Sequence, residues 1–207
     1  MQHTSRAHRS ITTDLTTDDG RVIGADIELV EGSVGAVALA HPHPLYGGDR
    51  HHPLMSRCAH LLAERRVDSV RFDFRREQAD ITSEISDLEA AMADLQSRSV
   101  ATCSTVLGYS FGALVALAAA ERLGLSHLVL VAPPLTSKQF EAPACAVTVV
   151  LGRHDQYCDP AALASTPVGR SADVHVVEGA DHFLSGSIDA VATIATAAII
   201  DRFVGHR

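Results

Sequence analysis

The sequence predicts an α/β protein in which helices cover both faces of a mostly parallel, twisted sheet. Short apolar segments alternate along the chain with longer helical ones, which is typical of strand–helix–strand units. Between residues 81 and 95 the apolar side chains recur at intervals of four and three, which marks one face of a helix. With 207 residues, 46% of them hydrophobic, the chain suits one domain with a single core.

Seven segments are expected to be strands, because they are short runs of mainly aliphatic and β-branched residues. In chain order they are Val22–Val30, Val34–Ala40, Ser69–Phe74, Cys103–Tyr109, His127–Val131, Ala146–Leu151 and Asp173–Val177. Since helical segments separate most of these strands, we expect them to pair in parallel and to be covered on both faces.

Five segments are expected to be helices. They are Pro53–Arg66, Thr82–Ser97, Phe111–Leu123, Pro160–Ser165 and Ile188–Val204. Two of them begin with proline, which suits the first helical position because an N–H has no partner within the helix there. Asp159 precedes the second of these prolines and is expected to cap its helix. The connection from Pro134 to Ala146 is too short for a cap domain, so we expect an open, shallow site.

Residues 108–112 read Gly-Tyr-Ser-Phe-Gly and join an expected strand to an expected helix. This pattern indicates a nucleophile elbow, a sharp turn that lifts the hydroxyl of Ser110 clear of the sheet. The two glycines let strand and helix approach closely. The N–H of Phe111 would then lie at a helix N-terminus, where an oxyanion could form. The alternative is a glycine- and serine-rich turn that does no chemistry.

A serine hydroxyl needs a base that takes its proton and an acid that orients the base. Asp155 and His182 follow Ser110 in the chain order that belongs to nucleophile elbows. Each lies just past the carboxyl end of an expected strand, where an open α/β sheet places its ligand site. The alternatives are an aspartate in a polar turn and a histidine satisfied within a loop. Asp159 is a rival acid, although its place before Pro160 favours the capping role.

Five segments carry a resemblance to a known family. They are residues 41–48 (HPHPLYGG), 70–75 (VRFDFR), 108–112 (GYSFG), 130–134 (LVAPP) and 179–183 (GADHF). The chain resembles the α/β-hydrolases, and more narrowly their small, capless, dienelactone-hydrolase-like bacterial group, from about Val34 to Val204. This resemblance implies a nucleophile at Ser110, an acid at Asp155, a base at His182 and no cofactor.

The resemblance also places a second oxyanion donor, beside Phe111, in the loop after the strand that ends at Ala40. Prolines 42 and 44 have no N–H, so the nearest donors in this loop are His43 and Leu45, and we favour His43 by position. Leu45 and Tyr46 of the same loop are candidate substrate contacts. One departure from the family is that true dienelactone hydrolases use cysteine as the nucleophile, where this chain has serine.

A second departure follows the strand that ends at Phe74, where relatives usually have a Gly-rich turn. Here the chain continues with Arg75 and Arg76. The guanidinium of Arg75 could bind the carboxylate or phosphate of an anionic acyl substrate, because its planar fork matches either group. The alternative is that both arginines are solvated or are paired with Glu77 and Asp80.

Four histidines, at positions 41, 43, 51 and 52, raise the alternative of a metal site. No acidic residue follows His43 to supply the next expected ligand, so we expect no metal. The plainer interpretation is a polar loop that leads into the helix beginning at Pro53. A third interpretation is that one of these histidines contacts the substrate.

Charge and composition narrow the function classes. The formal net charge of −8 argues against nucleic acid or an anionic membrane as the main partner. The four cysteines show no C-x-x-C spacing and indicate reduced thiols in a cytoplasmic protein. Residues 1–20 are polar and lack the apolar stretch of a signal peptide. We therefore expect an N-terminal tail, with disorder as one option, before a single domain over residues 21–207.

Three function classes remain. The first is a serine hydrolase that cleaves a carboxylic ester or thioester through an acyl-enzyme on Ser110. The second uses the same three residues for a cyclisation, lyase or acyl-transfer step, and the third is a non-catalytic binding module. The expected partner is a small-molecule acyl substrate, and a homodimer is left open.

Overall fold

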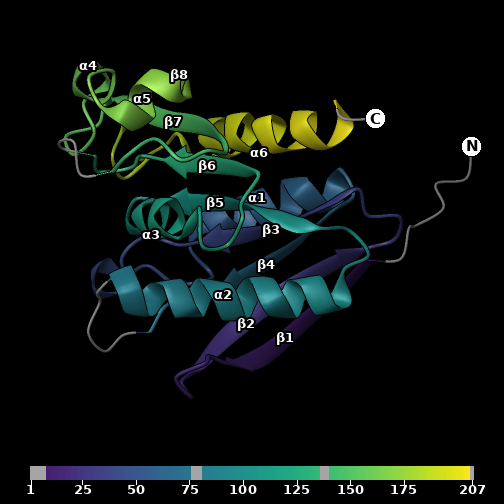
Figure 1. The fold of residues 1–207 in the computed structure, drawn as a ribbon. Helices are drawn as coiled ribbons and strands as arrows, with labels where there is room; N and C mark the ends of the chain where they lie inside the picture. The colour runs from purple at the N-terminus through teal and green to yellow at the C-terminus, as the bar shows by residue number, and fades with distance from the viewer. Residues whose placement is uncertain (1–7, 76–80, 136–139, 206–207) are drawn as a thin grey trace, which may run out of the picture.

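A single eight-stranded sheet organises the protein in the computed structural model, which describes residues 8–75, 81–135 and 140–205 (Figure 1). The strands are β1 (His8–Thr16), β2 (Val22–Val30), β3 (Gly35–Ala40), β4 (Val67–Phe72), β5 (Cys103–Tyr109), β6 (His127–Val131), β7 (Ala146–His154) and β8 (Asp173–Asp181). Their order in the sheet is β1-β2-β4-β3-β5-β6-β7-β8. The pairs β1–β2 and β2–β4 are antiparallel and all other neighbours are parallel, which confirms the predicted mostly parallel sheet.

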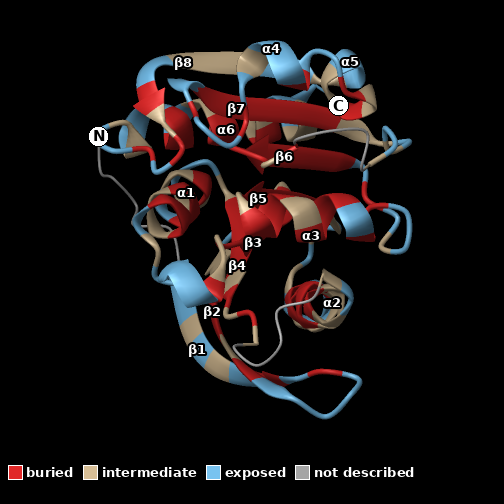
Figure 2. Ribbon diagram, turned by 90° about the vertical axis from the view of Figure 1, so that its left-hand side faces the viewer, coloured by how far each residue is buried: buried red, intermediate tan, exposed pale blue. Residues whose placement is uncertain are grey.

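Helices cover both faces of this sheet, as predicted. The helices are α1 (Pro53–Glu64), α2 (Ile81–Arg98), α3 (Phe111–Ala119), α4 (Pro160–Leu163), α5 (Pro167–Ser171) and α6 (Ile188–Val204), and a short 3₁₀ helix, η1, spans Pro44–Tyr46. Figure 2 shows α1 and α6 on one side of the sheet and α2 and α3 on the other. Among the described residues there is no cap domain, and none of their helices is long and apolar enough to cross a membrane.

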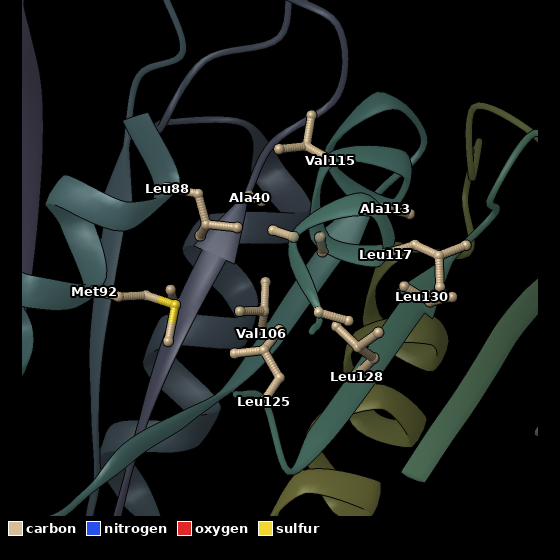
Figure 3. Close-up of a cluster of buried hydrophobic side chains, with 14 of the residues drawn as sticks. Ala40, Leu88, Met92, Val106, Ala113, Val115, Leu117, Leu125, Leu128 and Leu130 are labelled. Atoms are coloured by element: carbon tan, nitrogen blue, oxygen red, sulfur yellow. The ribbon is translucent and has the colours of Figure 1, made fainter. Parts of the chain in front are cut away.

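The core consists of two apolar layers, one on each face of the sheet. Strands β3 and β6 are buried at every position, as strands sandwiched between helices must be. Figure 3 shows the layer under α2 and α3, where aliphatic side chains of both helices meet those of β5 and β6. Its labelled members include Leu88, Met92, Val106, Val115, Leu117, Leu128 and Leu130. This packing fixes the carboxyl ends of the parallel strands, which carry the site.

The prediction of an N-terminal tail over residues 1–20 is wrong from residue 8 onwards. Residues 8–16 form β1, which pairs with β2 along its entire length. The segment has few apolar residues, but threonine favours strands and Leu15 is buried in the core. Side-chain bonds to β2 add to the pairing, such as the one from the Thr12 hydroxyl to Asp26, at 2.8 Å. Residues 1–7 lie outside the described residues.

Candidate active site

Ser110 occupies the sharp turn between β5 and α3, with φ of 52° and ψ of −110°. A positive φ is rare for a residue with a side chain and indicates a backbone held in a costly conformation. The hydrogen bond from the Ser110 N–H to the carbonyl of Val131 on β6, at 2.9 Å, helps to hold it. A Cβ on Gly108 would collide with the backbone of Gly112, and one on Gly112 with the carbonyl of Ala40. The predicted turn geometry is therefore present.

His182 lies between Ser110 and Asp155 and is hydrogen-bonded to both. Its Nε2 is 3.0 Å from the hydroxyl oxygen of Ser110. Its Nδ1 lies 3.0 Å and 3.1 Å from the two carboxylate oxygens of Asp155. The three residues directly follow β8, β5 and β7, at the carboxyl ends of parallel strands. The structure thus brings together the three residues that the sequence singled out.

Hydrogen bonds hold the Asp155 carboxylate in place, whereas Asp159, the other candidate acid, caps a helix. The side chain of Asp155 is fully buried, and its Oδ1 also accepts the backbone N–H groups of Tyr157 at 2.8 Å and Cys158 at 2.9 Å. These bonds fix the carboxylate that faces His182. Asp159 instead accepts the N–H of Ala162 at 2.8 Å, so its predicted role as the N-cap of α4 is confirmed.

A cavity of about 600 Å³ opens beside the Ser110 hydroxyl. Its walls come from the loops after β3, β5, β6, β7 and β8 together with the start of α3. The lining residues are Pro42, His43, Tyr46, Gly47, His52, Tyr109, Ser110, Phe111, Leu114, Pro134, Tyr157, His182 and Phe183. A serine paired with an imidazole at the floor of such a cavity can attack the carbonyl carbon of a bound molecule.

The sequence model of a protein family, described as the alpha/beta hydrolase domain, matches residues 35–195, which is well over half of the chain. The protein belongs to the α/β-hydrolase family. A putative alpha/beta hydrolase of unknown function from Agrobacterium tumefaciens has a similar structure, with a TM-score of 0.82, 21% identity and coverage of 94% of this chain and 97% of that one. An α/β serine hydrolase without a lid from Xanthomonas campestris matches with a TM-score of 0.78 and 23% identity, over 96% and 94% of the two chains.

The narrower resemblance to capless, dienelactone-hydrolase-like members of the α/β-hydrolase family is confirmed at the level of the fold. A dienelactone hydrolase from Anabaena variabilis matches with a TM-score of 0.70 and 18% identity, over 92% of this chain and 96% of that one. The Xanthomonas hydrolase has no lid, and in this chain the connection between β6 and β7 is likewise short.

Two backbone N–H groups of this α/β-hydrolase chain remain candidates for an oxyanion site. Phe111 is the first residue of α3, so its N–H has no partner within the helix. In the loop after β3, the N–H of Leu45 donates to the ring Nδ1 of His43 at 3.1 Å and is therefore occupied. This leaves His43 as the better donor of the two that the sequence offered. The rings of His43 and Phe111 lie 4.7 Å apart, so both residues border the same part of the cavity.

Of the three predicted substrate contacts, only one lines the cavity. Tyr46 lines the cavity, whereas its neighbour Leu45 is exposed and does not. Arg75 is also absent from the lining. Sequence reasoning missed Tyr157 and Phe183, which line the cavity from the loops that follow Asp155 and His182. Their closeness to these two residues was the available signal.

The predicted anion-binding role of Arg75 is wrong, because its guanidinium is already paired with two carboxylates of the protein. Its Nη2 lies 2.8 Å from Asp87 of α2 and its Nη1 lies 2.6 Å from Asp19 in the β1–β2 turn. Asp87 is fully buried and needs a positive partner, which Arg75 supplies. The bonds to Asp87 and Asp19 raise the pKa of Arg75 above its ordinary value. Arg76, Glu77 and Asp80 lie outside the described residues.

Each of the four clustered histidines has a structural partner. His41 accepts the N–H of Phe74 through Nε2 at 2.9 Å, and its Nδ1 lies 2.6 Å from the carbonyl of Pro42. His43 caps η1, His52 caps α1, and His51 lies beside Asp26. The described part of the chain contains no group of three or more His, Cys, Asp or Glu residues that could hold a metal ion.

Two buried histidines should make the fold sensitive to acid. Burial lowers the pKa of His41 and of His127 to about 4 from an ordinary value of 6.5. Between these values the unfolded chain binds more protons than the folded one, so the free energy of unfolding should fall as the pH drops from 6.5 to 4. Each histidine contributes a slope of at most about 1.4 kcal/mol per pH unit.

The variant His127→Gln should therefore show a shallower pH dependence than the wild type in urea unfolding between pH 4 and 6.5. The exposed His154 provides the matched control, since His154→Gln removes a histidine without changing the core. An unchanged slope in His127→Gln would contradict the prediction.

Tyr109 is a further residue that sequence reasoning did not assign to the site. It directly precedes Ser110, and its hydroxyl donates to the backbone carbonyl of His182 at 2.7 Å. Burial, together with the nearby Asp155 and Asp181, raises the pKa of Tyr109, so the phenol stays protonated and remains a donor. One side chain thus ties the elbow to the loop that carries the imidazole.

Replacing Tyr109 with phenylalanine should lower kcat by about 3- to 10-fold and leave KM nearly unchanged. The lost hydrogen bond is worth about 0.5–1.5 kcal/mol and positions the imidazole without touching the substrate. Steady-state kinetics and the rate of fluorophosphonate labelling measure the effect. Thr196→Val is the control, since it removes a buried hydroxyl hydrogen bond to a backbone carbonyl, 2.7 Å long, within α6 and outside the cavity lining. Equal losses in the two variants would contradict a positioning role for Tyr109.

Proposed function

We propose that this protein is a serine hydrolase that cleaves a carboxylic ester or thioester through an acyl-enzyme on Ser110. The observation that carries the proposal is the unbroken hydrogen-bonded series from the Ser110 hydroxyl through His182 to Asp155. The series ends at an open cavity, so that a substrate carbonyl and then water can reach the serine.

In the proposed reaction His182 Nε2 takes the proton of Ser110 as the hydroxyl oxygen attacks the substrate carbonyl. Asp155 holds the Nδ1–H tautomer and stabilises the imidazolium that forms. The N–H groups of Phe111 and His43 would donate to the oxyanion of the tetrahedral intermediate. His182 then gives its proton to the leaving alcohol or thiol, and a water molecule activated by the same imidazole hydrolyses the acyl-enzyme.

We also expect the enzyme to work in a reducing compartment, the cytoplasm. All four cysteines are free, and burial raises the pKa of Cys58 and Cys158 to about 12, which keeps these thiols neutral and unreactive. Such thiols act as small apolar core residues and need no oxidising environment.

A fluorophosphonate probe and a substrate panel test the proposed function together. The probe should label Ser110, identified by mass spectrometry of the modified peptide. The panel should include short carboxylic esters and thioesters, with product analysis that distinguishes a free acid from a cyclised or transferred acyl product. Free acid from at least one substrate is expected. Labelling with only cyclised or transferred products would favour the biosynthetic alternative, and the absence of both labelling and turnover would favour a binding module.

A further inference from the structure

The aromatic side chains of this protein are concentrated around the Ser110 cavity. The chain has only six phenylalanines and three tyrosines and has no tryptophan. All three tyrosines line the cavity, together with two of the phenylalanines. These five are Tyr46, Tyr109, Tyr157, Phe111 and Phe183. In a core built mainly from aliphatic residues, this distribution marks the cavity as a surface suited to binding rings.

The aromatic residues form two walls on either side of Ser110. Tyr46 follows β3 and Phe111 begins α3, while Tyr157 follows β7 and Phe183 follows β8. Since β5, which leads to Ser110, lies between β3 and β7 in the sheet, the two walls flank the serine.

The outer parts of both walls are open to solvent. Tyr46 is 90% exposed, Phe183 is 59% exposed and Tyr157 is 52% exposed. Tyr157 and Phe183 stand nearly perpendicular to each other, with ring centroids 6.4 Å apart. A ring bound between these faces would remove substantial apolar surface from water and gain edge-to-face contacts.

The described residues that line the cavity carry no formal charge at neutral pH beyond the hydrogen-bonded triad. None of these described lining residues is Asp, Glu, Lys or Arg. Desolvation lowers the pKa values of His43 and His52, so both rings are neutral. Arg75, the cation that could have balanced an anionic substrate, is bound to Asp87 and Asp19. A charged group in the cavity would lose hydration without finding a charged partner among the lining residues that the structure describes.

From these observations we propose that the enzyme selects uncharged esters that carry an aromatic ring next to the ester group, on the acyl or the alcohol side. The proposal rests on the serine hydrolase function and adds its substrate class. The ring would lie against Tyr46, Tyr157 and Phe183, and the ester carbonyl would lie above Ser110.

Matched pairs of esters test this selectivity in the wild-type enzyme. Ethyl phenylacetate is compared with ethyl cyclohexylacetate for the acyl side, and benzyl acetate with cyclohexylmethyl acetate for the alcohol side. In at least one pair the aromatic ester should have a kcat/KM about 3- to 10-fold higher, as expected for one or two aromatic contacts. Adding a para carboxylate to the ring of ethyl phenylacetate should lower kcat/KM by at least about 10-fold.

Two adjacent exposed residues provide the variant and its control. Tyr46→Leu keeps an apolar side chain but removes the ring, and it should abolish most of the aromatic preference while fluorophosphonate labelling persists. Leu45→Ala changes the neighbouring side chain, which is 69% exposed and outside the cavity lining, and it should leave the preference unchanged. Circular dichroism checks that both variants are folded.

The outcomes separate the two proposals. Equal rates within both pairs, or labelling of Ser110 without hydrolysis of either aromatic ester, would overturn the selectivity and leave the serine hydrolase function standing. A wild-type enzyme that neither reacts with the probe nor hydrolyses any ester would overturn the function, and the substrate class with it.

Discussion

Replacing Ser110 with alanine should lower kcat by about 10⁴-fold or more and leave the fold intact. The variant loses the oxygen that we propose attacks the carbonyl, while the proposed oxyanion donors and the cavity remain. Purified Ser110→Ala is assayed by steady-state hydrolysis of whichever ester the wild type cleaves fastest, and its thermal unfolding is compared with that of the wild type.

The control for this substitution is Ser185→Ala, which changes an exposed serine in the loop that follows His182. It should retain wild-type activity and full fluorophosphonate labelling. If purified Ser110→Ala kept activity near that of the wild type, the acyl-enzyme mechanism would be wrong.

Replacing Asp155 with asparagine should lower kcat by about 10⁴-fold, because an amide can turn its NH₂ towards His182 and favour the wrong imidazole tautomer. The carboxylate of Asp155 also accepts two backbone N–H groups, which the amide oxygen can still accept in part, so the loop should stay folded. Steady-state kinetics measure the loss, and circular dichroism confirms the fold.

Asp159→Asn is the matched control, since asparagine caps a helix about as well as aspartate does. Its kcat should stay close to that of the wild type because Asp159 caps α4. A large loss in Asp159→Asn with little change in Asp155→Asn would transfer the role of the acid to Asp159.

Much of the fold could be predicted because its signals are local. The bounds of α6 agree with the prediction, and α2 differs by one residue at each end, since the apolar period and the flanking polar residues define both helices. Strands β7 and β8 run longer than expected, to His154 and Asp181, because they continue to pair beyond their apolar parts. Strand β1 was missed because its stability comes from pairing with β2 and not from its own composition.

In the candidate site, too, some features follow from the local sequence and others depend on how distant segments pack. The order and spacing of Ser110, Asp155 and His182 pointed to their meeting, because each follows a parallel strand. The partners of Arg75 could not be predicted, since Asp19 lies 56 residues away in a hairpin turn and Asp87 reaches it only through the packing of α2. The aromatic walls likewise depend on the lateral order of strands in the sheet, which no local pattern reveals.

The division between a buried scaffold and an exposed rim has a consequence for evolvability. Ser110 and its partners follow strands that are fixed by the core, whereas Tyr46, Tyr157 and Phe183 stand largely in solvent. Substitutions at such exposed positions usually change the free energy of unfolding by less than about 0.5 kcal/mol. Single substitutions at these exposed residues can therefore change substrate preference, in evolution or in the laboratory. They should do so with little loss of the folding stability that holds Ser110, His182 and Asp155 in position.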